Sequence, residues 1–153
     1  MGSEGVREVV IDTYALLAIV YDEVGARARN VLENVRRGRV RGLIPVTVAY
    51  EYIVHWLRGR IPALKSIDEV TTYLKSYFRI AELSYEDYVE AAKIKVEGDE
   101  MLSSAEDREL RSRRLSIVDS SVIALALKVG APIVSGDKDL AYVATRKGVD
   151  VIW

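Results

Sequence analysis

Short apolar runs and longer amphipathic stretches alternate along most of this chain. The runs at 6–11, 42–46 and 131–135 are nearly continuous in apolar residues, which is typical of strands buried on both faces of a sheet. Two more strands are expected at about 79–83 and 150–153. Because helical patterns separate these strands, the sequence predicts an α/β fold with a parallel sheet.

Helical periodicity and capping residues place helices between the strands. Ser66 with Glu69, and Ser84 with Asp87, have capping-box spacing and mark two helix starts. An almost wholly apolar helix should end at Gly130. The predicted helices cover residues 13–37, continuing or restarting near 23, then 47–58, 66–78, 84–97, 117–130 and 140–147. The charged stretch 98–114 has few apolar residues, so we expect an exposed helix or arm there.

Size and composition narrow the class of protein. The chain has 153 residues, which fits a single domain over 1–153. It has no cysteine, which excludes disulfides, zinc ribbons and thiol nucleophiles and favours an intracellular, cytoplasmic location. No apolar run approaches the ~20 residues of a membrane span, so a soluble protein is expected. The net charge of -1 argues against a protein that coats nucleic acid.

Four acidic residues stand where predicted strands give way to helices. Asp12 directly follows the first strand, Asp137 closely follows the fourth, and Glu51 lies one turn into the helix after the second. Asp119 opens the apolar helix. A carboxylate beside a packed core is costly unless a cation or hydrogen bonds compensate it. Mg²⁺ or Mn²⁺ is the simplest cation for an all-oxygen site, so the sequence predicts a metal-dependent active site.

Each acid also has an ordinary interpretation. Asp12 can serve as a helix N-cap, and Asp119 has capping-box spacing to Ser116. Asp137 lies in a Gly-Asp turn before a helix, and Glu51 can pair with a basic residue on its own helix. Capping does not require all four acids to fall at strand ends with apolar neighbours, so we favour the metal site.

Three segments of the chain carry a recognisable pattern of acids and apolar residues. They read VVIDTYALLA (9–18), VAYEYIVHWL (48–57) and LSIVDSSVIALALKVGAPIVSGDKDL (115–140). The last is the most specific, because it combines an acid, small residues, an apolar helix, Gly, a strand, Ser and Asp-x-Asp in order. Together the segments resemble the signature segments of PIN-domain ribonucleases, particularly the VapC-type toxins, and the resemblance spans residues 9–153.

The resemblance implies a three-layer α/β/α sandwich around a central parallel sheet. The site residues that it implies are Asp12, Glu51, Asp119 and Asp137 as an acidic quartet, Asp139 as an accessory metal acid and Ser135 as the small hydroxyl residue that orients the site. It also implies an RNA substrate, a homodimer and a VapB-type antitoxin. The long charged stretch before the third acid departs from the common pattern, so a toxin and another small archaeal-type PIN protein both fit.

The chemistry expected of such a site follows from its charge. Clustered carboxylates repel one another, so without a cation at least one pKa should rise, and a divalent ion restores full ionisation. We expect Asp12 and Asp119 to contact the ion, and Glu51 and Asp137 to act directly or through water. An activated water would attack an RNA phosphorus in line with the departing 3′ oxygen, leaving a 5′ phosphate and a 3′ hydroxyl.

Two groups of arginines are candidates for binding RNA phosphates. They are Arg36, Arg37, Arg39 and Arg41, and Arg108, Arg111, Arg113 and Arg114. A solvated charged face is the ordinary interpretation of each group, and interspersed acids weaken the second group further. Contact with an acidic or amphipathic partner segment is an alternative use.

Other conspicuous side chains favour structural roles. His55 is expected on the helix surface or half-buried, because no nearby sequence supplies a nucleophile motif. Tyr50, Tyr52 and Trp56 have helical spacing that is typical of packing residues, and they could equally form a dimer surface.

The main alternative function is a catalytically inactive PIN-fold scaffold that binds RNA or protein. Intact acids at all four positions favour the enzyme. A phosphatase with an aspartyl nucleophile needs a second Asp two residues after Asp12, where Tyr14 stands instead. A dinucleotide-binding enzyme is disfavoured still more, because no G-x-G-x-x-G follows the first strand.

Overall fold

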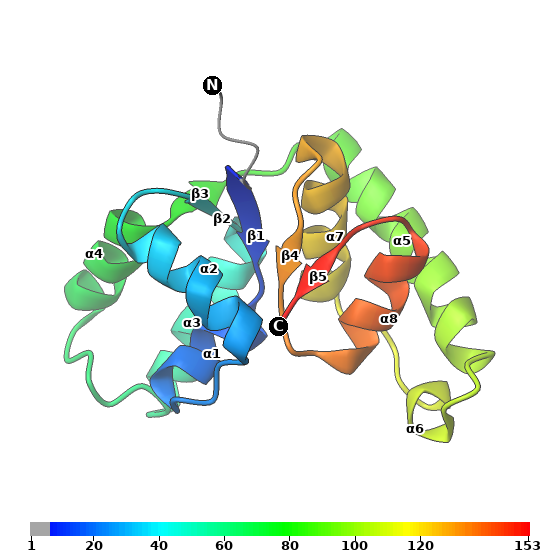
Figure 1. Cartoon of the computed structure of the whole chain (residues 1–153), viewed down its shortest axis with the longest axis horizontal. Coiled ribbons are helices and arrows are strands. Elements are labelled where there is room, and N and C mark those ends of the chain that lie inside the picture. Colours follow the sequence, from blue (N-terminus) through cyan, green and yellow to red (C-terminus); the bar gives the residue numbers. More distant parts are fainter. Residues whose placement is uncertain (1–6) are drawn as a thin grey trace.

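The computed structural model describes residues 7–153 (Figure 1). Val6, the first residue of the predicted first strand, lies outside them. Within the described chain, parallel strands form one sheet in the order β3-β2-β1-β4-β5. They are β1 (Glu8–Ile11), β2 (Arg41–Pro45), β3 (Arg79–Ala81), β4 (Ile133–Val134) and β5 (Val151–Ile152). The predicted parallel sheet is confirmed.

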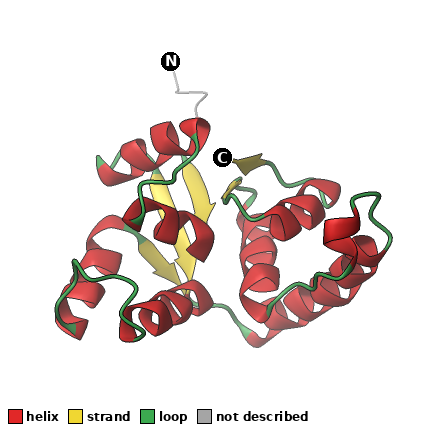
Figure 2. Cartoon of the chain, turned by 90° about the horizontal axis from the view of Figure 1, so that it is seen from below, coloured by secondary structure: helices red, strands yellow, loops and turns green. Residues whose placement is uncertain are grey.

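The central strand β1 shows that both faces of the sheet are covered. Its Val10 lies beside Leu43 of β2 on one side and Ile133 of β4 on the other. Val9, Val10 and Ile11 are completely buried, although successive side chains of a strand point to opposite faces. Helices must therefore pack on both faces, and Figure 2 shows them flanking the sheet. The predicted α/β/α sandwich is confirmed.

The helices divide between the two ends of the strand order. They are α1 (Thr13–Val20), α2 (Ala26–Arg36), α3 (Val46–Leu57), α4 (Ile67–Tyr77), α5 (Tyr85–Ser103), α6 (Arg108–Arg111), α7 (Ile117–Val129) and α8 (Lys138–Arg146). The first four gather around β1 to β3, and α5 to α8 lie on the side of β4 and β5 (Figure 1). The mostly buried α7 packs against β1, β2 and β4 and so ties the two groups together.

Local chemistry explains where several helices begin and end. The first predicted helix restarts rather than continues, because the chain turns at Asp22, whose φ is 54°. Gly130 ends α7 with a φ of 68°, as expected. Ser84 opens α5 with a full capping box, but Ser66 forms only half of one. The prediction of a second full box was wrong in this respect, because the Glu69 carboxylate accepts the N–H of Lys65 instead.

The charged stretch 98–114 is not simply an exposed arm. Helix α5 continues through its first residues to Ser103, and its few apolar side chains are spaced to face inward. Leu102, Ala105 and Leu110 are all buried in the core. Gly98 lets α5 approach closely, since a Cβ there would overlap the Leu115 side chain. The expectation of an exposed segment was therefore wrong for these positions.

No helix in the described residues combines the length and apolar character that crossing a membrane requires.

Candidate metal centre

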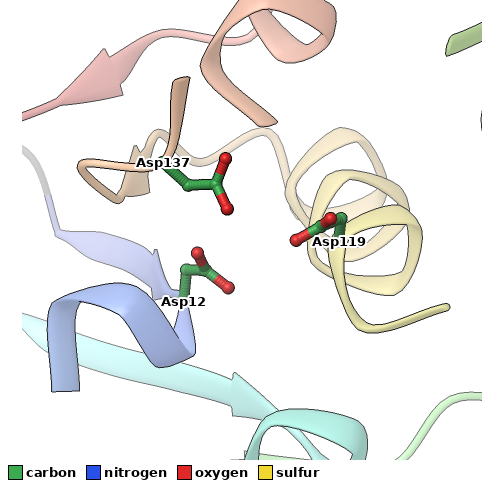
Figure 3. A group of neighbouring side chains, drawn as sticks. All are labelled: Asp12, Asp119 and Asp137. Carbon is green, nitrogen blue, oxygen red and sulfur yellow. The ribbon is translucent and has the colours of Figure 1, made fainter. Parts of the chain in front are cut away.

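Three carboxylates from distant parts of the chain meet at the carboxyl ends of the strands (Figure 3). Asp12 follows β1, Asp137 follows the neighbouring β4, and Asp119 lies in the first turn of α7. Each offers one oxygen, and these three oxygens all lie within 4.8 Å of one another. The strand order explains why Asp12 and Asp137 are close, because the carboxyl ends of adjacent parallel strands lie at the same end of the sheet.

Asp12 is buried and is held by a side chain rather than by its own helix. It stands at the N-cap position of α1, but its carboxylate accepts no capping hydrogen bond. Instead its Oδ2 accepts a hydrogen bond of 2.9 Å from the buried Ser135 hydroxyl. The Ser135 Oγ in turn accepts the N–H of Asp137 at 3.0 Å. Ser135 thus links two of the acids, and the capping interpretation of Asp12 does not apply.

Asp119 and Asp137 cap helices and also face the shared centre. The Asp119 Oδ2 accepts the Ser116 N–H at 3.0 Å within a full capping box. The Asp137 Oδ1 accepts the N–H groups of Asp139 and Leu140 at 2.9 and 3.3 Å. Among the described residues, these bonds engage only one oxygen of each carboxylate. Capping is therefore compatible with a metal role, because the second oxygen keeps its lone pairs for a ligand.

The electrostatics of the centre favour protonation in the absence of a cation. Burial, followed by the charge of Asp119, raises the pKa of Asp12 to about 7, although the Ser135 hydrogen bond acts in the opposite direction. Burial also raises the pKa of Asp119 to about 6, against the hydrogen bonds from Ser116 and with the help of the Asp137 charge. Three carboxylates gathered in this way need a positive charge to be ionised together.

Glu51 and Asp139 do not belong to the group of three. Glu51 is half-buried on α3, and its charge raises the pKa of Asp12 and Asp119, so it lies near the centre. The Oδ2 of the buried Asp139 accepts a hydrogen bond of 2.8 Å from Arg113 Nε. The structure thus brings three of the four predicted acids together, places Glu51 close by and pairs Asp139 with an arginine.

Comparison with protein families decides the relationship that this geometry indicates. Residues 9–146 match the PIN domain. The chain belongs to the PIN domain family. PIN domains are generally nucleases, and the acidic centre lies where ligands bind in open parallel sheets.

Solved structures share the PIN fold at low sequence identity. PAE2754 from Pyrobaculum aerophilum is 18% identical, with a TM-score of 0.57 over 95% of this chain and 90% of that one. Mycobacterium tuberculosis VapC20, a toxin that cleaves the sarcin-ricin loop, is 16% identical, with a TM-score of 0.54 over 87% of this chain and 92% of that one. These identities show a common fold alone. No curated protein matches the chain significantly.

The loop that carries Asp137 depends on a close approach that only glycine allows. A Cβ on Gly136 would lie 2.6 Å from ring atoms of both Tyr14 and Trp153. Those two rings pack edge to face, with centroids 5.4 Å apart. Packing of the two rings against Gly136 therefore fixes the backbone between Ser135 and Asp137 in this PIN domain.

Sequence reasoning missed two residues that position α7. The Asp99 Oδ1 accepts the Leu115 N–H at 2.8 Å, and Lys95 Nζ donates to the Leu115 carbonyl at 2.7 Å. Lys95 and Asp99 also pair with each other at 2.8 Å. They clamp the residue before Ser116 and hence the start of the helix that presents Asp119. Their four-residue spacing signals an ion pair on one helix but not its target.

The two predicted arginine groups lie in different surroundings. In the first, Arg41 begins β2 and Arg36 comes at the end of α2, so this group lies at the amino ends of the strands. Arg36 and Arg37 pair with Glu33, and Arg41 pairs with Glu8. The first arginine group is therefore at the opposite end of the strands from the acidic centre. In the second group, Arg113 contacts Asp139, which comes two residues after Asp137 of the acidic centre.

The remaining candidates on α3 have structural contacts. His55 is half-buried, its Nδ1 lies 2.8 Å from an Arg60 nitrogen, and burial followed by the Arg60 charge lowers its pKa. Tyr52 is buried and stacks on Tyr73, and Trp56 Nε1 donates to a backbone carbonyl at 2.8 Å. The packing interpretation is confirmed for Tyr52 and Trp56. Tyr50 is 69% exposed, so packing within the chain does not account for it.

Proposed function

We propose that this chain is an endoribonuclease that depends on Mg²⁺ or Mn²⁺. The observation that carries the proposal is the convergence of Asp12, Asp119 and Asp137 at one edge of the sheet. A set of carboxylate oxygens fits a hard divalent cation, and burial of Asp12 gives the protein a strong preference for such a charge. Membership of the PIN domain family supports the reaction class.

The residues of the centre divide the work of hydrolysis. Asp12 and Asp119 would hold the ion, Ser135 would orient Asp12, and Asp137 would act directly or through water. When bound, the ion would stabilise charge on the phosphate oxygens and make a nearby water more acidic. Glu51, whose charge acts on both Asp12 and Asp119, would accept a proton from the attacking water. That oxygen bonds to phosphorus as the bond to O3′ breaks, and O3′ takes up a proton.

We infer further that the protein acts in the cytoplasm as the toxin of a toxin-antitoxin pair. The support is its PIN domain and the fold that it shares with VapC20, itself a toxin. A homodimer and an antitoxin of the VapB type are the partners that this function implies. An inactive RNA- or protein-binding scaffold is the alternative, but a scaffold has no need for three carboxylates that converge around a buried one.

Cleavage of RNA by the purified protein tests the proposal. Excess EDTA should abolish cleavage, and Mg²⁺ or Mn²⁺ should restore it. Asp119→Asn should still bind RNA but cleave it roughly a hundredfold more slowly or worse, since even residues one step removed from a metal contribute about 10–100-fold. The matched control is Glu86→Gln, which removes an exposed acid of α5. Its neighbour Asp87 pairs with Lys128 in the last turn of α7, so Glu86 lies far from the Asp119 end of that helix. Undiminished cleavage in chelator would refute the proposal.

A further inference from the structure

The guanidinium of Arg113 is held on one side and open on the other. Its Nε donates to Asp139 Oδ2 at 2.8 Å, and the Asp139 side chain is only 8% exposed. The Arg113 side chain is nevertheless 59% exposed. Among the described residues, neither terminal nitrogen of Arg113 forms a hydrogen bond. One edge of the guanidinium is thus fixed to the protein, while both Nη groups stay available to a ligand.

The backbone on each side of Arg113 is anchored. Before it, Arg111 Nε donates to the Ala105 carbonyl at 2.7 Å. After it, Leu115 is clamped by Lys95 and Asp99. A side chain that reaches outward from so restrained a loop, and is aimed by a buried carboxylate, loses little further conformational freedom when it binds a ligand.

Arg113 stands beside the acidic centre rather than elsewhere on the surface. Its partner Asp139 comes two residues after Asp137, in the first turn of α8. The hydrogen bond to Asp139 and then its charge, followed by the charges of Asp137 and Asp119, raise the already high pKa of Arg113. The guanidinium is therefore a permanent positive charge at the border of a site that otherwise repels anions.

We propose that Arg113 binds a backbone phosphate of the RNA strand beside the scissile one, and that Asp139 is its positioning residue. The inference rests on the proposed function. The planar guanidinium presents two Nη groups that match two phosphate oxygens, while Nε stays on Asp139. Asp139 then serves the arginine and not the metal ion, because the positive guanidinium that it holds repels a cation from this carboxylate.

RNA binding tests the phosphate contact without interference from cleavage. In an Asp119→Asn background, fluorescence anisotropy follows a short labelled single-stranded RNA over a range of salt concentrations. Arg113→Gln should weaken the Kd about tenfold and lower the slope of log K against log salt by about 0.7, the value for one lost phosphate contact on a single strand. Arg113→Lys keeps the charge and the slope but binds more weakly than arginine, because it loses the fork.

A charge-matched control separates local contact from bulk charge. Arg27→Gln removes an exposed arginine of α2 that has no ion pair among the described residues, and it should leave both Kd and slope unchanged. In the otherwise native enzyme, Asp139→Asn should raise KM severalfold with little change in kcat. The reason is that the misplaced guanidinium weakens binding of the strand and not the chemical step.

Metal binding then decides the role of Asp139. The double variant Arg113→Gln with Asp139→Asn removes one charge of each sign, so the net charge of the centre is kept. We expect it to bind Mn²⁺ alone, without RNA, within about threefold of the native affinity. If the Asp139 carboxylate held the ion, its loss would instead weaken Mn²⁺ affinity about tenfold or more.

Two results would overturn the proposal. One is native RNA affinity and salt slope in both the Gln and Lys variants at position 113, with melting temperatures showing that each is folded. The other is loss of Mn²⁺ binding in the double variant. The proposed function fails separately, when the native protein cleaves no RNA in any divalent metal. An Arg113-dependent salt slope in that case would leave the phosphate site standing on its own.

Discussion

The two ends of the parallel sheet carry opposite charges in opposite environments. At the carboxyl ends, Asp12 and Asp137 meet Asp119 in a buried to half-buried centre. At the amino ends, exposed arginines that include Arg39 and Arg79 line one pocket. Like charges gather at both ends, but only one end is withdrawn from water.

Burial decides which of the two charge clusters needs a bound ion of opposite charge. Exposed arginines are screened by solvent and by acids such as Glu8 and Glu33, and such surface pairs contribute about 0–1 kcal/mol each. Asp12 has no basic partner among the described residues, and its pKa of about 7 records the cost of charging it. A charged patch is therefore weak evidence for a site, whereas a buried cluster of one sign is strong evidence.

The largest effect expected from this contrast is on the stability of the metal-free protein. The pKa of Asp12 is about 7 when folded and ordinarily 3.8, so the folded state binds the proton more tightly. Its contribution to stability is present in full below the ordinary pKa and is lost as pH rises through about 7. Asp12→Asn in EDTA should therefore raise the free energy of unfolding at about pH 8 by about 2–4 kcal/mol.

Urea denaturation in EDTA at several pH values measures this difference. The gap between Asp12→Asn and the native protein should narrow toward about pH 5, and added Mg²⁺ should stabilise only the native protein. Asn keeps an oxygen that can accept the Ser135 hydrogen bond, so the comparison isolates the charge. A variant that is less stable than the native protein at about pH 8 in EDTA contradicts the account.

A smaller effect should come from Ser135, which touches the centre without carrying charge. Ser135→Ala removes the donor to Asp12 Oδ2, so the ionised form of Asp12 is less favoured and Mn²⁺ affinity should fall about tenfold. Isothermal titration measures the affinity. Ser103→Ala is the control, because its hydroxyl donates only to a carbonyl at the exposed end of α5. Equal affinities in both variants would remove Ser135 from the orienting role.

The smallest effect is expected at the basic edge. Arg39→Ala should change the rate of RNA cleavage by less than about twofold, because this exposed arginine lies at the opposite edge of the sheet. Single-turnover cleavage of a short RNA measures the rate. A tenfold loss of cleavage rate would contradict the contrast between the two ends of the sheet. It would mean that the bound RNA extends around the protein to the amino ends of the β-strands.

The sequence predicted the strands of the sheet and the positions of the acids beside them because both depend on local patterns. A buried strand and the residue that follows it are neighbours in the chain, so Asp12 and Asp137 could be placed at strand ends. Capping-box spacing likewise placed Asp119 at the start of α7. What brings these residues together is the order of the strands, and for that the resemblance to PIN domains supplied the expectation.

The parts that sequence did not predict depend on contacts between distant residues. Arg113 finds Asp139 across 26 positions, and Lys95 reaches Leu115 across 20. In a highly charged stretch every arginine has many equivalent acids within reach, so composition cannot select the partner. The burial of Leu102 and Leu110 in the same stretch was also not predicted, because two or three well-spaced apolar residues suffice to bury one face of a short segment.

Binding of Mn²⁺ to the purified protein tests the central claim most directly. The account predicts saturable binding by the native protein, weakened about tenfold or more by either Asp12→Asn or Asp119→Asn, and unchanged by the exposed Glu86→Gln. Equal Mn²⁺ affinity in all four proteins would contradict it, because the converging carboxylates would then not hold a metal ion.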